Sequence, residues 1–354
     1  MNIALLNDTH CGARNSSDVF MQYQEKFYNE VFFPYLLEND IKEVIHLGDY
    51  YEHRKYVNFK SLEHNRKIFL DKLREYGMHM RIIPGNHDVY YKNTNQLCSL
   101  KELMGHYTDC VTIEMAPAVF TDYYDCPIAL IPWINAENYN ETMQFVDTCN
   151  ASIIGGHFEF SGFEMYKGIP NPHGMDTARF KRFEMVLSGH FHTKSNNDNI
   201  HYLGSQMEFT WGDCDDPKYF HILNTNTREL TPIRNPFTLH NKIIYNDEKT
   251  DYNNYDVSTL DSQFVKVVVE KKTDYFAFDR FIDRIQQRPI HELKIAESFD
   301  EFLGDNVEDG EIELDDTQVL LDSYIDAVET EADKDKLKSL LRGLYVEAQS
   351  TSLI

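Results

Sequence analysis

Long apolar runs are missing from this sequence. No uninterrupted apolar segment reaches the roughly 18 residues that a membrane-spanning helix needs. The first residues, MNIALLNDTH, also lack the basic segment that precedes the apolar part of a signal peptide. We therefore predict neither a membrane anchor nor secretion, and we expect the protein to work in the cytoplasm.

Closely spaced cysteine pairs are missing as well. The six cysteines are scattered, and none of them forms a C-x-x-C pair. Scattered thiols are typical of proteins in a reducing compartment, where disulfides are rare. The pattern therefore predicts free thiols, and it does not favour a thiolate metal site.

Basic residues are scarce. Lys and Arg number 34 against 58 Asp and Glu, which gives a formal net charge of −24, and residues 241–354 hold 27 of these acids against 13 bases. This balance argues against a protein that binds nucleic acid tightly by itself. It does not exclude nucleic acid as a substrate, because bound divalent cations reverse the field at a carboxylate-lined site.

Most of the chain alternates short apolar runs with helical patterns. We predict strands over 3–6, 43–47, 79–83, 127–132, 151–154, 185–187, 201–203 and 219–223. Apolar residues at four-residue spacing predict helices over 18–37, capped by Asp18, and over 61–77, capped by Ser61 and ended by Gly77. This β-α-β order predicts an α/β domain over 1–238, with functional loops at the carboxyl ends of its strands.

The pattern changes near residue 240. The segment SQFVKVVVEKK predicts one more strand, and a helix follows that ends before Pro289, so we expect a small α+β domain over 239–296. Residues 297–316 contain ten acids and no base, which is typical of a solvated linker. Apolar stripes beyond it predict terminal helices over 317–349, and these pack either on a partner or on the protein itself.

Five short polar signals follow predicted strands in the first 192 residues. Each offers oxygen or nitrogen donors beside small residues. They are Asp8-Thr9-His10, Gly48-Asp49, Gly85-Asn86-His87-Asp88, Gly155-Gly156-His157 and Gly189-His190-Phe191-His192. Taken singly, each signal is more often an ordinary turn or helix cap, but five in succession at strand ends favour a shared site.

The donor set of these signals has a clear chemical preference. Carboxylate, amide and imidazole donors together suit first-row cations such as Mn²⁺, Fe²⁺ or Zn²⁺ better than Ca²⁺. Two such ions roughly 3.5–4 Å apart can clamp a phosphate ester for in-line attack by hydroxide. The sequence therefore predicts a site for two divalent metal ions, and we expect Mn²⁺.

The order of these motifs resembles that of the calcineurin-like metallophosphoesterase superfamily. The resemblance implies a four-layer αββα sandwich with a small C-terminal α+β cap domain and terminal helices. It also implies roles for the nine motif residues. Asp8, His10 and His192 would hold one ion, Asn86, His157 and His190 the other, and Asp49 would bridge, while His87 would assist the leaving oxygen with Asp88 orienting its ring.

Within this superfamily the chain looks most like the nuclease subunit of SbcCD-type complexes, above all the compact bacteriophage versions. The segments LNDTHCG, HLGDYYEHRK, IPGNHDVYYKN and LSGHFHT support this likeness. It implies DNA as substrate, an SbcC-type ATPase partner bound by the C-terminal helices, and a homodimer in a host-cell cytoplasm. Some relatives place a phosphate-contacting His three residues after the bridging Asp. Here that position is Glu52, so either His53 or Arg54 takes that role, or both are surface residues.

Other functions remain open at this stage. A small-molecule phosphodiesterase or a protein phosphatase uses the same metal set, although phosphatases continue G-D-x-x-D-R-G where this chain has GDYYEHRK. A non-catalytic subunit that binds DNA ends is the alternative of another class. An intact set of predicted ligands favours an enzyme over that alternative.

Overall fold

A mixed six-stranded sheet contains the first strand of the chain. The computed structural model describes residues 1–122, 126–166, 169–171 and 174–296, together with Lys334, Lys336 and Lys338. The sheet has the order β16 (Leu230–Arg234), β15 (Tyr219–Asn224), β1 (Asn2–Leu6), β2 (Glu43–His46), β3 (His79–Ile82) and β6 (Val111–Ile113). Strands β1, β2, β3 and β6 are parallel, whereas β15 and β16 run antiparallel to their neighbours.

A second six-stranded sheet is also mixed. Its order is β13 (Ser195–Asn197), β14 (Ile200–Tyr202), β12 (Met185–Ser188), β9 (Ile153–Gly156), β8 (Ile128–Ile131) and β7 (Ala118–Phe120). The four central strands are parallel and the two outer strands are antiparallel. Every strand predicted from 3 to 223 is present, with its ends shifted by one or two residues.

Alternating side chains bury both faces of each sheet. In β1, Ile3 and Leu5 belong to the apolar core that also contains Leu187 of the second sheet, whereas Ala4 and Leu6 belong to a core shared with helices. Val186 faces the opposite way to Leu187, into a third core. Each large side chain buried in this way contributes about 1.5–3 kcal/mol relative to exposure. The three cores separate four layers, which confirms the predicted αββα sandwich.

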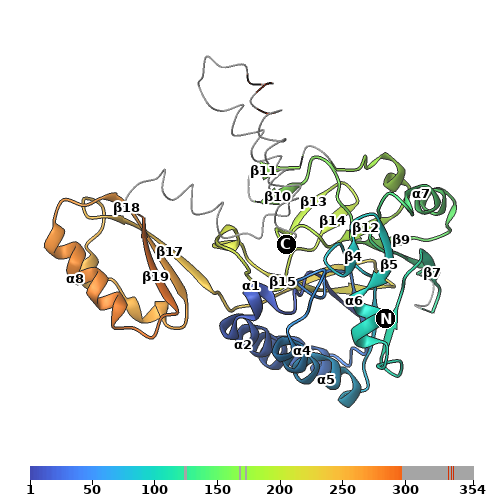
Figure 1. The fold of residues 1–354 in the computed structure, drawn as a ribbon, viewed down its shortest axis with the longest axis horizontal. Helices are drawn as coiled ribbons and strands as arrows, with labels where there is room; N and C mark the ends of the chain where they lie inside the picture. The colour runs from blue at the N-terminus through green and yellow to red at the C-terminus, as the bar shows by residue number, and fades with distance from the viewer. Residues whose placement is uncertain are drawn as a thin grey trace, which may run out of the picture. The chain divides into compact units, whose positions relative to one another are not determined.

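Two bent helical segments pack against the first sheet. One is α2 (Asp18–Phe27), which continues through a π turn at Tyr28–Phe32 into α3 (Phe33–Glu38). The other is α4 (Phe59–Asn65), which continues through Arg66–Leu70 into α5 (Asp71–Glu75). Helix α2 lies beside α4, and α5 continues the segment that α4 begins (Figure 1). Helix α7 (Tyr139–Thr148) contributes Met143 and Val146 to the core of the second sheet.

Both predicted helix caps are wrong, although the helices are present. Ser17 precedes α2, and Asp18 is already its first residue. The side chain of Asn58 caps α4 by accepting a hydrogen bond from the Lys60 N–H, so this helix starts before Ser61. Nearby Ser, Asn and Asp residues compete for the cap position, and the pattern alone does not rank them. The predicted stop at Gly77 is confirmed, because its φ of +59° ends the helix.

Several short elements connect the layers. They are α1 (Ala13–Ser16), β4 (Val89–Tyr91), β5 (Thr94–Cys98), α6 (Ser99–Met104), β10 (Glu164–Tyr166), β11 (Ile169–Pro170) and the 3₁₀ turns Ala178–Arg182 and Trp211–Asp213. All six cysteines are free and buried, as the sequence predicts. Among the described residues, no helix has the length and apolar character to cross a membrane.

A smaller α+β region follows β16, the last strand of the first sheet. Strands β17 (His240–Asn246), β18 (Phe264–Lys271) and β19 (Glu292–Ala296) form one sheet, and helix α8 (Tyr275–Gln286) packs on it through its own apolar core. Short 3₁₀ turns lie at Tyr252–Asn254 and Val257–Leu260. The chain divides into two units, Met1–Ile295 and Ala296–Ile354. The predicted linker over 297–316 lies outside the described residues, as do the helices over 317–349 apart from three lysines.

One buried histidine makes the fold sensitive to acid. His221 on β15 lies opposite Leu5 and is 1% exposed, and neither ring nitrogen has a hydrogen-bond partner among the described residues. Burial, with the nearby charge of Lys194, lowers the pKa of His221 to about 3. The unfolded chain takes up this proton near pH 6.5, whereas the folded chain does not, so its contribution to stability is present above that pH and is lost as the pH falls.

We expect His221→Leu to remove this part of the acid sensitivity. Relative to the variant, the native chain should lose about 1.4 kcal/mol of unfolding free energy between pH 7.5 and pH 5.5. The difference between the two proteins should stay constant from pH 7.5 to pH 8.5, where the ring is neutral in both states. Urea unfolding in the presence of chelator measures the two unfolding free energies at pH 5.5, 7.5 and 8.5. If the difference between the two proteins were the same at all three pH values, the assignment would be ruled out.

Candidate metal centre

The predicted ligands meet where the two sheets present the carboxyl ends of their parallel strands. Asp8 and His10 follow β1, Asp49 follows β2, and Asn86 follows β3, all in the first sheet. The second sheet supplies the remaining three, which are His157 after β9 and His190 and His192 after β12. The fold therefore brings together seven side chains that span nearly 190 positions of sequence, as the motif order predicted.

Unusual backbone geometry aims several of these side chains. Asp8, His10, Asp49 and His190 have φ values of 50°, 45°, 55° and 88°. Non-glycine residues adopt this left-handed region at a cost of order 1–3 kcal/mol each, and they are concentrated at functional sites. The surrounding core therefore holds these residues in conformations that the isolated chain avoids.

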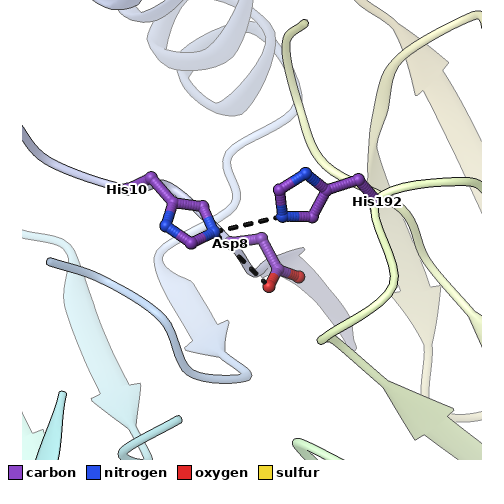
Figure 2. Close-up of side chains that lie close together, drawn as sticks. All are labelled: Asp8, His10 and His192. Atoms are coloured by element: carbon purple, nitrogen blue, oxygen red, sulfur yellow. Dashed lines mark hydrogen bonds and ion pairs between the residues drawn. The ribbon is translucent and has the colours of Figure 1, made fainter. Parts of the chain in front are cut away.

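Asp8, His10 and His192 form the first group of donors (Figure 2). Nε2 of His10 lies 3.1 Å from Nε2 of His192 and 3.9 Å from Oδ1 of Asp8. Both imidazoles thus turn the same ring nitrogen toward one point, beside a carboxylate. Phe209 closes the group, with its ring 5.2 Å from that of His10 and 5.5 Å from that of His192. One divalent cation fits this donor set.

Asp49, His157 and His190 form the second group, and Asn86 joins them. Nε2 of His157 lies 3.1 Å from Oδ2 of Asp49 and 3.0 Å from Oδ1 of Asn86, which is 3.1 Å from Nδ1 of His190. The other ring nitrogen of His157 donates to the Leu47 carbonyl at 2.8 Å. That bond fixes the tautomer, so Nε2 is available as a ligand.

The glycine before Asn86 is required by the position of Asp49. A Cβ atom on Gly85 would lie 2.1 Å from Oδ1 of Asp49 and 2.4 Å from its backbone nitrogen. No side chain is tolerated at such a distance. The same carboxylate oxygen accepts a hydrogen bond from the His87 N–H at 2.9 Å. Two neighbouring loops therefore close around Asp49 and hold its second oxygen toward His157.

Charge at the centre is dominated by carboxylates that face imidazoles. Burial lowers the pKa of His10, but the charges of Glu52, Asp49 and Asp8 outweigh burial and raise it to about 10. Burial likewise lowers the pKa of His157, and Asp49 and Asp8 raise it to about 9. A cation that binds here must displace protons from these rings, so metal binding releases protons and strengthens as the pH rises.

The expected partner of the His87 ring is wrong. We expected Asp88 to orient the imidazole, but the Asp88 carboxylate is fully buried and accepts hydrogen bonds from the N–H groups of Tyr50, Tyr51 and Gly85. Nδ1 of His87 instead lies 2.5 Å from the Glu52 carbonyl oxygen. A carboxylate that can satisfy three backbone donors is better solvated in the loop than beside the ring.

Two residues of the centre were missed by the sequence analysis. Oε2 of Glu52 lies 2.6 Å from Nδ1 of His10, and Glu52 with His10 and His87 forms a third group of close donor atoms. Lys218 is buried, pairs with Asp213 at 2.6 Å and donates to the His192 carbonyl at 2.9 Å. The only available signal for Glu52 was its position three residues after Asp49. Nothing in the sequence pattern marks Lys218.

The two residues that we considered as phosphate contacts lie on the loop after Asp49. His53 stacks on Tyr56 with ring centroids 4.4 Å apart. Arg54 is half-buried on the same loop. Neither residue belongs to the three donor groups found among the described residues. Their contact with phosphate stays a prediction.

We expect Asp49→Ala to weaken the binding of both predicted metal ions, because the predicted role of this carboxylate is to bridge the two positions. The Mn²⁺ affinity should fall by more than the roughly 10–100-fold loss that is typical when a residue that contacts a metal ligand, and not the metal itself, is replaced. Asp109→Ala, which removes an exposed carboxylate that pairs with Arg74, is the matched control. Calorimetric titration with Mn²⁺ measures both affinities, and retention of two tight ions by Asp49→Ala would contradict the shared position.

Known proteins provide an independent comparison. The family model described as calcineurin-like phosphoesterase matches residues 1–194. The chain is 31% identical to exonuclease subunit 1 of Enterobacteria phage T4 over 351 residues, which cover 98% of this chain and 99% of that protein. Two solved structures are more distant. An archaeal phosphodiesterase is 14% identical with a TM-score of 0.34, and a Thermus thermophilus protein is 11% identical with a TM-score of 0.39. Each match covers 66% of this chain. It covers 100% of the archaeal chain and 98% of the Thermus thermophilus chain.

The family model covers more than half of the chain and includes every predicted ligand from Asp8 to His192. The phage relative extends the likeness over nearly the whole length of both proteins. Both findings agree with the donor groups at the strand ends. The chain belongs to the calcineurin-like phosphoesterase family.

Proposed function

We propose that this protein is a metal-dependent nuclease that hydrolyses DNA phosphodiester bonds. The observation that carries the proposal is the pair of adjacent donor groups, one around His10 and one around His157, with Asp49 beside His87. Its likeness to an exonuclease subunit over nearly the full length supports a nuclease over a small-molecule phosphodiesterase or a protein phosphatase. In this proposal the enzyme processes DNA ends or breaks in recombination, repair and replication.

The seven ligands divide between two ions in this proposal. Asp8, His10 and His192 would hold one ion, Asn86, His157 and His190 would hold the other, and Asp49 would be shared between them. Two divalent ions, for which Mn²⁺ is our choice, would supply Lewis-acid activation of a phosphate ester and of water for in-line attack. The chain's own residues would fix where the ions lie.

His87 supplies the proton for the leaving oxygen. A carbonyl oxygen only accepts, so Nδ1 of His87 bears the hydrogen that points to Glu52. Nε2 is then the ring atom that presents a proton to the substrate when the imidazole is charged. The backbone bond from His87 to Asp49 keeps this ring next to the bridging carboxylate. General acid catalysis by a ring held in this way typically contributes about 10²–10⁴-fold to the rate.

The segment that runs from Glu52 into the first turn of α4 supports DNA as the substrate. It contains Arg54 and Lys55, and Lys60 of α4, which pairs with Asp18, in a chain that is otherwise strongly acidic. Two of its aromatic rings are exposed to solvent, Tyr56 by 59% and Phe59 by 86%. Basic side chains contact phosphates and exposed aromatic rings stack on unpaired bases, which is the pattern of single-strand binding. Glu52 joins this segment to the centre through its contacts with His10 and His87.

A partner completes the proposed enzyme. The net charge of −24 leaves little positive surface for duplex DNA, so another subunit must hold the DNA backbone. The phage relative is named a subunit, which supports assembly into a complex. We propose an SbcC-type ATPase that binds the helices over 317–349, a homodimer of this chain within the complex, and action in the host-cell cytoplasm.

We expect His87→Ala to keep both metal ions and slow DNA cleavage by about 10²–10⁴-fold, because it removes the proton donor and no ligand. Single-turnover cleavage of labelled DNA and metal analysis of the same sample measure the two effects. His106→Ala, at an exposed histidine, should cleave like the native chain. Loss of an ion from His87→Ala would make His87 a ligand.

We expect the double variant Tyr56→Ala with Phe59→Ala to bind single-stranded DNA about 10-fold or more weakly, because stacking contributes about 1–3 kcal/mol per base. Hydrolysis of a nitrophenyl phosphodiester should be unchanged, since that substrate offers no strand to stack. Tyr139→Ala, at another exposed aromatic, is the control. Equal losses on both substrates would point to damage at the centre. Cleavage of the nitrophenyl ester without DNA cleavage by the native chain would favour a small-molecule enzyme.

A further inference from the structure

Glu52 touches the centre in two ways. Its carboxylate Oε2 lies 2.6 Å from Nδ1 of His10, and its carbonyl oxygen lies 2.5 Å from Nδ1 of His87. The side chains are shielded from water, with 17% of Glu52 and 5% of His10 exposed. The contact is a short ion pair between two shielded groups, so solvent and salt screen it less than a surface ion pair.

The backbone of Glu52 is anchored independently of its side chain. The Glu52 N–H donates to the carbonyl of Cys11 at 3.1 Å, and the preceding Tyr50 and Tyr51 N–H groups donate to Asp88. Residue 52 is therefore fixed next to the segment that contains His10. A substitution of the side chain changes the contact with His10 and leaves the carbonyl contact with His87 in place.

The contact with His10 fixes which ring nitrogen faces the centre. The negative charge of the carboxylate beside Nδ1 favours the tautomer with the ring proton on that nitrogen, so Nε2, which faces Asp8 and Nε2 of His192, is the nitrogen that a cation deprotonates and binds. An anionic partner on the far nitrogen also makes the ligating nitrogen a better donor to a cation. Both effects strengthen the binding of one ion and have little influence on the group around His157.

We propose that Glu52 is a positioning residue that orients His10 and strengthens the metal position formed by Asp8, His10 and His192. The inference rests on the proposed metal-dependent function. The alternative is a third cation held by Glu52, His10 and His87. The 2.6 Å separation opposes it, because ligand atoms from two side chains, each about 2.0–2.2 Å from one ion, lie about 3 Å or more apart.

The test compares Glu52→Gln and Glu52→Ala with Glu63→Ala, which removes an exposed carboxylate paired with Lys67. Mn²⁺ is titrated into the chelator-treated full chain, and free Mn²⁺ is followed by its paramagnetic resonance signal. We expect the native chain to bind two ions. Glu52→Ala should weaken one of them by about 10–100-fold and leave the other unchanged. Glu52→Gln, which keeps an acceptor oxygen, should lose less, and Glu63→Ala should lose nothing.

Each other outcome overturns the inference. Identical Mn²⁺ binding curves for the native chain and all three variants would show that Glu52 has no effect on metal binding. A third ion in the native chain that disappears in Glu52→Ala would make Glu52 a ligand. Thermal unfolding in chelator checks that the near-isosteric Glu52→Gln folds like the native chain. Because the readout uses no DNA, it stands even if DNA is not the substrate. A native chain that binds no Mn²⁺ would instead refute the proposed function itself.

Discussion

The Asp49 carboxylate is held at the point where the two sheets and their loops meet, and the centre depends on that placement. One of its oxygens accepts from the His87 N–H, and the other lies 3.1 Å from Nε2 of His157. Gly85 leaves room for it, since a Cβ there would overlap the carboxylate. Burial alone would raise the pKa of Asp49, but His157 and His87 hold it well below its usual range. The Asp49 carboxylate is therefore anionic, and its oxygens are held in position, before any cation binds.

Backbone strain and buried charge at the centre lower the stability of the fold, and the apolar cores of the sandwich offset this loss. Four of the predicted ligands have strained left-handed backbone, at about 1–3 kcal/mol each, and the buried carboxylates must be neutralised by imidazole rings. Three apolar cores, filled from both faces of each sheet, hold the strands whose ends bear the ligands. The ligands come from loops, but each loop starts at a buried strand, so the loops have little freedom to relax the strain.

Much of this arrangement follows from local pattern. Runs of apolar residues predicted the central strands, and the five short motifs after them predicted seven candidate ligand side chains, which the fold brings into neighbouring groups. Short edge strands such as β7 and β13 were missed, because three residues offer too little periodicity. Caps at Asp18 and Ser61 were wrong because several residues nearby suit the same role.

The contacts around His87 show where sequence reasoning fails. The Glu52 carbonyl that faces this ring is a backbone group. Every residue has one, so the sequence gives no signal for this contact. Asp88 was assigned to the ring because it is adjacent in sequence, but its oxygens accept hydrogen bonds from the N–H groups of Tyr50 and Tyr51, on the loop after β2, and of Gly85, on its own loop. Long-range contacts of this kind depend on how loops from different strands cross, and motif spacing does not encode that.

Two ions that share the Asp49 carboxylate are the central claim of this account. Low-temperature electron paramagnetic resonance of the full chain, with Mn²⁺ added at twice its molar concentration, tests it most directly. A bridging carboxylate couples the two electron spins, so the account predicts the signal of an exchange-coupled pair. The spectrum of isolated Mn²⁺ ions alone, at full occupancy, would contradict it.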